Sequence, residues 1–324
     1  MFVRLSVLIV TALLVFPAAA DPNPKGYENW KTDFSITSVD LSEIRSGGPP
    51  KDGIPPIDEP KLVDVSAEKV LTDQEPVIML EVNGDARAYP LSTLMWHEIA
   101  NDVVGGEPVA VTYCPLCNAS IVFLAKHEDQ KLDFGTTGRL RNSDLVMYDR
   151  QTETWWQQFS GEAIVGELTG AKLKMLPSTT VSWASFKEKY PDGKVLIPNN
   201  PEFRQYGRNP YAYYDTAKRP FLYSGSMPDG IEPMARVIIV DDGDSEFAIT
   251  MDAVREAGTI EKDGAVLTWS GGMVSALDSS SIADGREIGQ VTVTRKSDGA
   301  PMVHHVTFAF VAHAFHEGLE ISGI

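Results

Sequence analysis

Short runs in which apolar and polar residues alternate, separated by turn-forming residues, make up most of the chain. The runs PVIMLEV (76–82) and ARAYPL (86–91) flank the dipeptide Asn83-Gly84, which favours a two-residue hairpin turn. Residues 131–168 repeat the pattern, with short apolar runs between Gly, Asn and Asp turns. This periodicity of two predicts a protein built mainly of β-strands.

Two further strands and two helices are predicted from the remaining periodic segments. The runs EPVAVTYC (107–114) and NASIVFLA (118–125) predict a strand-turn-strand unit. The segment LSTLMWHEIAND (91–102) has the apolar spacing of a short helix. A second helix is predicted in VSWASFKEKYPDG (181–193), where the proline ends it.

An internal repeat is visible when the two halves of the chain are compared. The segment PVIMLEVNGDARAYPL, from Pro76, aligns without gaps with RVIIVDDGDSEFAITM, from Arg236. In the same order, VAVTYCPLC aligns with AVLTWSGGM, and VSWASFKEKYPDG with VTFAFVAHAFHEG. Ser270 and Met273 stand at the cysteine positions in the second copy. The sequence therefore predicts an α+β fold, β-rich, with two pseudo-repeated lobes and short helices.

These patterns divide the chain into five segments. The segment between the lobes, rich in Tyr, Pro and Asn, is too long and too aromatic for a plain linker. The predicted segments are a signal peptide (1–20), a Pro/Gly-rich N-terminal arm (21–60), a first lobe with the cysteines (61–200), a connector (201–235) and a second lobe without cysteines (236–324).

The N-terminus has the composition of a secretory signal peptide. Arg4 provides the positive charge, residues 5–16 form an apolar run, and small residues lead to a cleavage site after Ala20. The apolar run reaches Pro17 too early for a membrane-spanning helix, so no membrane span is expected after cleavage. We therefore predict a periplasmic or secreted protein. The net charge of −17 argues against nucleic acid and anionic lipid surfaces as partners.

The only two cysteines, Cys114 and Cys117, stand three positions apart in the segment VTYCPLCNAS. A structural disulfide between them would close a four-residue loop and contribute only about 2 kcal/mol in the chain-entropy model. A metal held by both thiolates can be linked to folding free energies on the order of 10 kcal/mol. A redox pair is the third interpretation, because this spacing lets one thiolate attack a disulfide and the other resolve it.

A metal site at these thiols requires ligands beyond the two cysteines. Zinc takes four ligands in a structural site and three plus water in a catalytic one. His97 is the best candidate, because the helix over 91–102 and the strand over 107–114 should bring it near Cys114. Two thiolates and one imidazole suit zinc or copper(I). The alternative interpretation of His97 is a packed, hydrogen-bonded side chain beside Trp96.

The leading hypothesis is a soft-metal site with Cys114, Cys117 and His97 as ligands, and copper or zinc as the metal. The second is thiol-disulfide exchange with a partner protein, in which Cys114 and Cys117 are the catalytic pair. Exchange enzymes place the dithiol at a helix N-terminus, whereas a strand is predicted here. A ligand-binding module with a structural disulfide is the third. No hydrolase, phosphate-loop or dinucleotide motif is present in the sequence.

Several motifs together resemble a prokaryotic family of unknown function, domain family 3179. They are SGGPPKDGIPPID, ARAYPL followed by HEIAND, VTYCPLCNAS, LRNSDLVMYDRQT followed by Trp and Gln, and NPYAYYD. The resemblance extends from about Ser46 to Tyr223 and more weakly to the C-terminus.

The resemblance implies a set of polar residues that come from separate segments of the first lobe, as in a cleft site assembled from loops. Turn or capping roles are the alternative for the Asn and Asp residues among them. Because the second lobe lacks the thiols, one site per chain is expected. The implied residues are His97, Asn101, Asp102, Cys114, Cys117, Asn142, Asp149 and Gln158.

Overall fold

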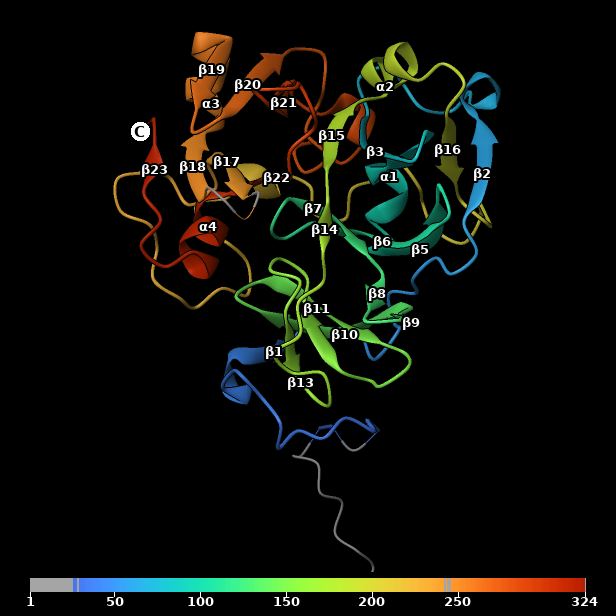
Figure 1. The fold of residues 1–324 in the computed structure, drawn as a ribbon, viewed down its shortest axis with the longest axis vertical. Coiled ribbons are helices and arrows are strands. Elements are labelled where there is room, and N and C mark those ends of the chain that lie inside the picture. Colours follow the sequence, from blue (N-terminus) through green and yellow to red (C-terminus); the bar gives the residue numbers. More distant parts are fainter. Residues whose placement is uncertain (1–25, 28, 242, 244–245, 324) are drawn as a thin grey trace, which may run out of the picture.

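The computed structural model describes residues 26–323 except for residues 28, 242, 244 and 245. The protein is β-rich, and its small sheets are arranged in a ring, like the blades of a five-bladed propeller (Figure 1). The signal peptide predicted at 1–20 lies outside the described residues. In the described part of the chain, no helix is both long and apolar enough to cross a membrane.

Three of the sheets and a two-stranded ribbon come from the first two thirds of the chain. In chain order their strands are β1 (Ile44–Ser46), β2 (Lys61–Asp64), β3 (Pro76–Val82), β4 (Asp85–Pro90), β5 (Ile99–Val104), β6 (Glu107–Cys114), β7 (Ala119–Leu124), β8 (Lys126–His127), β9 (Gln130–Lys131), β10 (Phe134–Arg141), β11 (Asp144–Asp149), β12 (Trp155–Gln157), β13 (Ala163–Val165), β14 (Met175–Leu176), β15 (Ser178–Ser182) and β16 (Lys194–Ile197). The sheet orders are β1-β10-β11-β12-β13, β14-β7-β6-β5 and β15-β3-β4-β16-β2, and the ribbon is β8-β9.

Two smaller sheets come from the last third, with strand orders β22-β17-β18-β23 and β19-β20-β21. Their strands are β17 (Arg236–Asp241), β18 (Glu246–Thr250), β19 (Thr259–Lys262), β20 (Ala265–Ser270), β21 (Gln290–Arg295), β22 (His304–Phe308) and β23 (Ile321–Ser322). The helices are short: α1 (Leu91–Leu94), α2 (Trp183–Lys189), α3 (Met251–Ala257) and α4 (Ala309–Phe315), with 3-10 turns η1 (Leu41–Glu43), η2 (Val65–Ala67), η3 (Tyr214–Thr216) and η4 (Ile282–Asp284).

The predicted hairpins form where the sequence places them. Asn83 and Gly84 both have positive φ, 51° and 84°, as a type I′ turn requires, and β3 pairs with β4 in antiparallel register. Strands β6 and β7 follow the predicted limits to within a residue. Helix α2 begins after Ser182, whose side chain accepts a hydrogen bond from the Ser185 amide, and ends before Pro191.

The prediction of a helix over 91–102 is confirmed only for its first turn and is wrong for the rest of the segment. Helix α1 ends at Leu94, and Glu98 has a φ of 59°, in the left-handed region that a right-handed helix cannot contain. The β-branched residues that follow then form β5, which pairs with β6 along its whole length. Asn101 and Asp102 therefore lie on a strand.

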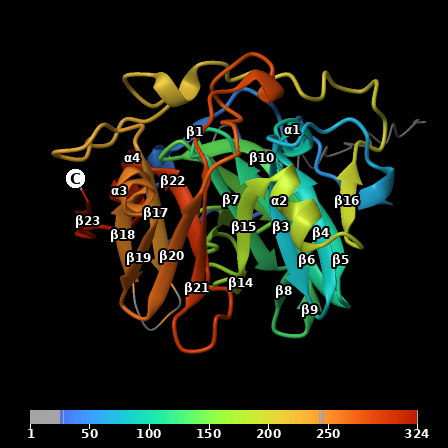
Figure 2. The same cartoon turned by 90° about the horizontal axis from the view of Figure 1, so that it is seen from above.

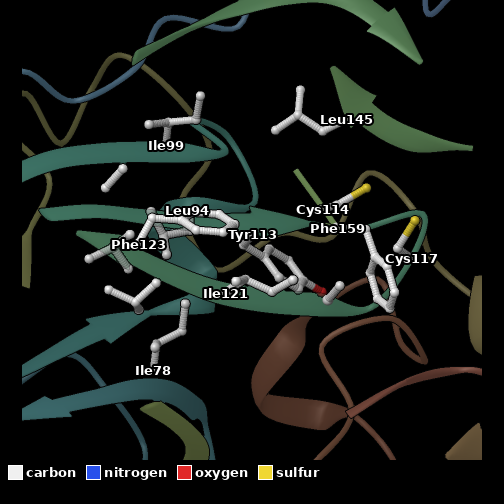
Figure 3. Packing of buried hydrophobic residues seen from close by; sticks show 14 of the residues in the cluster. Ile78, Leu94, Ile99, Tyr113, Cys114, Cys117, Ile121, Phe123, Leu145 and Phe159 are labelled. Carbon is white, nitrogen blue, oxygen red and sulfur yellow. The ribbon is translucent and has the colours of Figure 1, made fainter. Parts of the chain in front are cut away.

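The main hydrophobic cluster is shared between the two predicted lobes. It includes Leu94, Tyr113 and Phe123 from the first lobe and Phe308 and Phe310 from the second. Figure 3 shows the first-lobe part of this packing, with the two cysteines at its edge. Because the cluster is continuous, two separate lobes are not confirmed.

The sheets that contain β3 and β17 nevertheless share the arrangement of four strands, and β2 is an additional strand in the first. In each, an antiparallel hairpin leads into a short helix, and a later strand-helix-strand unit adds one antiparallel and one parallel neighbour. Val77 pairs with Pro90 as Val237 pairs with Thr250, which matches the ungapped alignment of these segments. For the segments that begin at Val181 and Val306, the structure shifts the sequence alignment by one position. Val181 pairs with Val77 as Thr307, and not Val306, pairs with Val237. The duplication stays a prediction, which this topology supports.

Two long segments outside the sheets pack on the ring. In the described part of the N-terminal arm, Trp30, Phe34 and Ile44 are buried against the sheet that contains β11. The connector (201–235) runs along the top of the ring in the view of Figure 2. Its Tyr214 is buried and donates a hydrogen bond to the carbonyl oxygen of Leu116, 3.1 Å away. The connector therefore covers the turn between the two cysteines.

A buried histidine in β22 should make the stability of the protein depend on pH. His305 is buried against Phe159, and burial lowers its pKa from about 6.5 to about 3. The imidazole of His305 therefore binds a proton more tightly in the unfolded chain than in the folded one. Its contribution to the free energy of unfolding is fully present above the unfolded pKa, and it is lost as the pH falls toward 3. At pH 4 the expected loss is on the order of 3 kcal/mol.

Urea unfolding of the wild type and of His305→Leu between pH 7 and pH 4 measures this contribution. The variant should lose less stability than the wild type on acidification, whatever its stability at pH 7. Equal pH slopes for the two proteins would show that His305 does not contribute.

Candidate functional site

The two cysteines are held by a tight turn between β6 and β7. Cys114 is the last residue of β6 and pairs with Ala119, the first residue of β7. The Cys117 amide donates to the Cys114 carbonyl oxygen over 3.2 Å, and Asn118 closes the turn with a φ of 51°. Both thiols are free and buried, and Figure 3 shows their sulfur atoms on the same side of the hairpin end. No helix begins at this turn.

Neighbouring elements fix the backbone of this turn. The carbonyl oxygen of Cys117 accepts the Thr307 hydroxyl at 2.8 Å and the Phe308 amide at 3.4 Å, both from β22. The Leu116 carbonyl oxygen accepts the Tyr214 hydroxyl from the connector. The turn is therefore tied to the last third of the chain and to the connector, which limits its movement.

A buried aspartate completes the cluster. Asp144 is the first residue of β11, directly after the Asn142-Ser143 turn, and it is inaccessible to solvent. Its Oδ2 atom accepts the side-chain amide of Gln157 at 2.6 Å and the Phe159 amide at 2.9 Å. Its Oδ1 atom is buried, and among the described residues only the two thiols are close enough to interact with it. One oxygen of this carboxyl group is thus available for a ligand.

The two sulfur atoms and a carboxylate oxygen of Asp144 all lie within 4.8 Å of one another. Cys114 also donates to the Ser143 carbonyl oxygen at 3.8 Å, which holds its sulfur at the start of β11. Burial raises the pKa of both thiols, and it raises the pKa of Asp144 to about 6. At neutral pH the two thiols are therefore favoured in their neutral forms, whereas the Asp144 carboxyl group is still mostly ionised.

A second buried acid lies within electrostatic reach of this cluster. Burial, and then repulsion from Asp144, raise the pKa of Glu98 to about 8. Among the described residues, no ion pair joins Glu98 or Asp144 to a cationic side chain. The two thiols therefore lie near two buried acids that have no cationic partner among the described residues, and of these acids Asp144 is the one ionised at neutral pH.

The structure does not bring His97 into this cluster. Its Nδ1 atom is 2.7 Å from the Pro55 carbonyl oxygen, and its Nε2 atom is 2.7 Å from the Tyr206 hydroxyl. Its ring stacks on Phe203 and Tyr206 from the connector. Both ring nitrogens are therefore engaged elsewhere, because α1 ends early and the chain turns at Glu98 before β6.

Two of the remaining residues implied by the family resemblance join strands to one another. Asn101 donates to Asp58 and to the Phe134 carbonyl oxygen, and it accepts the Phe134 amide. Asp102 pairs with Arg87 at 2.7 Å and accepts the Tyr89 hydroxyl. These contacts link β5 to β4 and β10, so both side chains support the scaffold.

Two of the other three implied residues have hydrogen-bond partners, and the third occupies a turn. Asn142 occupies a left-handed turn position with a φ of 52°. Asp149 accepts the Thr152 amide and the Trp156 indole N–H, at 2.7 and 2.9 Å. Gln158 donates to the Thr112 hydroxyl at 2.8 Å. Of the implied set, only the two cysteines lie together at one site.

Asp144 and Glu98 were missed by sequence reasoning. Asp144 lies inside the motif LRNSDLVMYDRQT, as a charged residue at the start of an otherwise apolar strand. A buried acid at such a position signals a partner, but its proximity to the thiols depends on the pairing of distant strands.

Comparison with known proteins identifies the family of this chain. No curated protein matches the sequence, and no solved structure matches it. A family model described as "Protein of unknown function (DUF3179)" matches residues 51–318, which extends well beyond the region of strongest resemblance and includes the cysteine turn and its tether on β22. Since this match covers most of its length, the chain belongs to the DUF3179 family.

Proposed function

We propose that Cys114, Cys117 and Asp144 form a closed metal site. The observation that carries this proposal is the buried Oδ1 atom of Asp144, which lies beside two thiols. Among the described residues, no cationic side chain forms an ion pair with Asp144 or Glu98. Burying ionised acids without a partner costs several kcal/mol per charge. A metal cation removes this cost, and its binding releases the protons that burial retains.

The donor set favours zinc, with copper(I) as the alternative metal. Two thiolates and one carboxylate are usual zinc ligands, whereas copper(I) prefers soft donors and would use the two sulfur atoms alone. The burial of all three donors argues against a site open to a large substrate, and the three protein ligands leave one of the four zinc positions for a further ligand such as water. Because burial raises the pKa of Glu98 to about 8, this acid is largely protonated at neutral pH and would add negative charge near the ion only on losing its proton.

The alternative is a redox or structural dithiol. Its support is the Cys-x-x-Cys spacing, which brings the two thiols within one turn. Exchange catalysts use an exposed thiolate with a lowered pKa, whereas these thiols are buried and burial raises their pKa. The environment of the thiols therefore supports metal binding more strongly than exchange.

The cellular location of the protein is proposed from the sequence of its N-terminus. Residues 1–20 have the composition of a signal peptide, so we infer cleavage after Ala20 and a periplasmic or secreted mature chain. In an oxidising compartment, a bound metal also protects the two thiols from forming a disulfide.

Metal content should depend on the proposed ligands. Protein purified without added metal or reductant is expected to contain about one zinc or copper ion per chain by elemental analysis. Cys114→Ser and Asp144→Asn should lose most of this metal. Ser270→Ala is the matched control, because Ser270 occupies the position of Cys114 in the other hairpin of the predicted repeat. A wild type without metal, or a metal that survives in Cys114→Ser, would contradict the proposal.

Replacement of His97 distinguishes the ligand set of the structure from the set predicted by the sequence. His97→Ala should retain the metal content of the wild type, because both ring nitrogens already have partners. Elemental analysis beside Asp144→Asn measures the difference. Metal loss in His97→Ala with retention in Asp144→Asn would restore His97 as the third ligand.

Thiol reactivity separates metal binding from exchange. In folded protein treated with a chelator, both thiols should react with Ellman's reagent at least about 100-fold more slowly than in urea, because they are buried and protonated. Rapid reaction of one thiol in the folded protein, together with reduction of a disulfide substrate, would favour thiol-disulfide exchange instead.

A further inference from the structure

A cavity of about 830 Å³ lies away from the thiol site. It is bounded by β2, the end of β16, the segment after η2 and the start of the connector. This volume is within the range of cavities that hold small organic ligands. Much of its wall is apolar, including Val63, Leu71, Leu196, Ile197, Pro198 and Tyr206.

The acidic residues at this cavity are already bound to the backbone. The Glu68 carboxylate accepts the amides of Val70 and Leu71. The Glu75 carboxyl group accepts the Thr72 amide at 3.0 Å. These backbone contacts hold one oxygen of each carboxyl group, Oε1, in place at the wall.

Two arginines at the cavity have no acidic partner. Within the described part of the chain, neither Arg204 nor Arg208 lies within ion-pair distance of a carboxylate. The Arg204 guanidinium group lies 4.1 Å from the centre of the Phe203 ring, which holds it without neutralising its charge. In a chain with a net charge of −17, two such cations beside an apolar wall are complementary to an anion.

His97 anchors the wall that carries these arginines. It bonds to the Tyr206 hydroxyl, and its ring stacks on Phe203 and Tyr206, on either side of Arg204. His97 itself is fixed to the body of the protein through the Pro55 carbonyl oxygen. The connector is thus held at the cavity with its cationic side chains in place.

We propose that this cavity binds an amphipathic organic anion, a carboxylate with an apolar chain. The apolar wall receives the chain, and Arg204 and Arg208 receive the carboxylate, for which the guanidinium fork provides paired donors. This binding site is independent of the metal site, since none of its lining residues belongs to the cysteine cluster.

Calorimetry with dodecanoate, below its micellar concentration, tests the proposal on the purified protein. The wild type should bind about one dodecanoate per chain, and Arg204→Ala/Arg208→Ala should bind at least about tenfold more weakly. Arg219→Ala is the matched control, because Arg219 is an exposed arginine of the same connector outside the cavity, and it should bind as the wild type does. His97→Ala should also weaken binding.

Two other probes identify which part of the ligand is recognised. Dodecyltrimethylammonium, with the same chain and opposite charge, and acetate, with the head group alone, should both bind much more weakly than dodecanoate. Absence of dodecanoate binding, equal binding of the ammonium compound, or full retention of binding in the double arginine variant would each overturn the proposal.

Discussion

The cost of burying acidic groups without a counter-charge is the constraint on which the centre of this protein depends. Two thiols and Asp144 lie within 4.8 Å of one another, inaccessible or nearly so, with Glu98 close enough to raise the charge cost further. A fold that only needed a core would place apolar side chains there. The surrounding contacts from β22, β11 and the connector hold these groups together, which is the behaviour expected of a preformed cation site.

Several of the polar residues implied by the family resemblance have one of two structural roles. Asn101 and Asp102 join strands of different sheets, and Asp149 ties β11 to the adjacent β12, so their substitution should affect the scaffold before it affects a ligand. His97 connects the body to the connector, which covers the cysteine turn and also forms one wall of the cavity proposed to bind an organic anion. The connector therefore links both proposed binding sites without contributing a metal ligand.

The predicted repeat offers a reason why the thiols occur in only one of two similar hairpins. The hairpins β5-β6 and β19-β20 share their register, and Ser270 takes the place of Cys114. Among the described residues, Cys114, Cys117 and Asp144 form the one group of ligands found close enough to hold a metal, so the proposed metal site lies in one half of the molecule.

Local sequence determined the strands, the Asn83-Gly84 turn, the cysteine hairpin and the helix α2, because side-chain periodicity and turn residues act over a few positions. The prediction from local sequence was wrong for most of 91–102, where the apolar spacing is that of a helix but pairing with β6 stabilises a strand. The partner of the cysteines was decided only by tertiary structure. Asp144 reaches them, and His97 does not, because the pairing of strands distant in the chain sets which side chains meet, and no local pattern encodes that pairing.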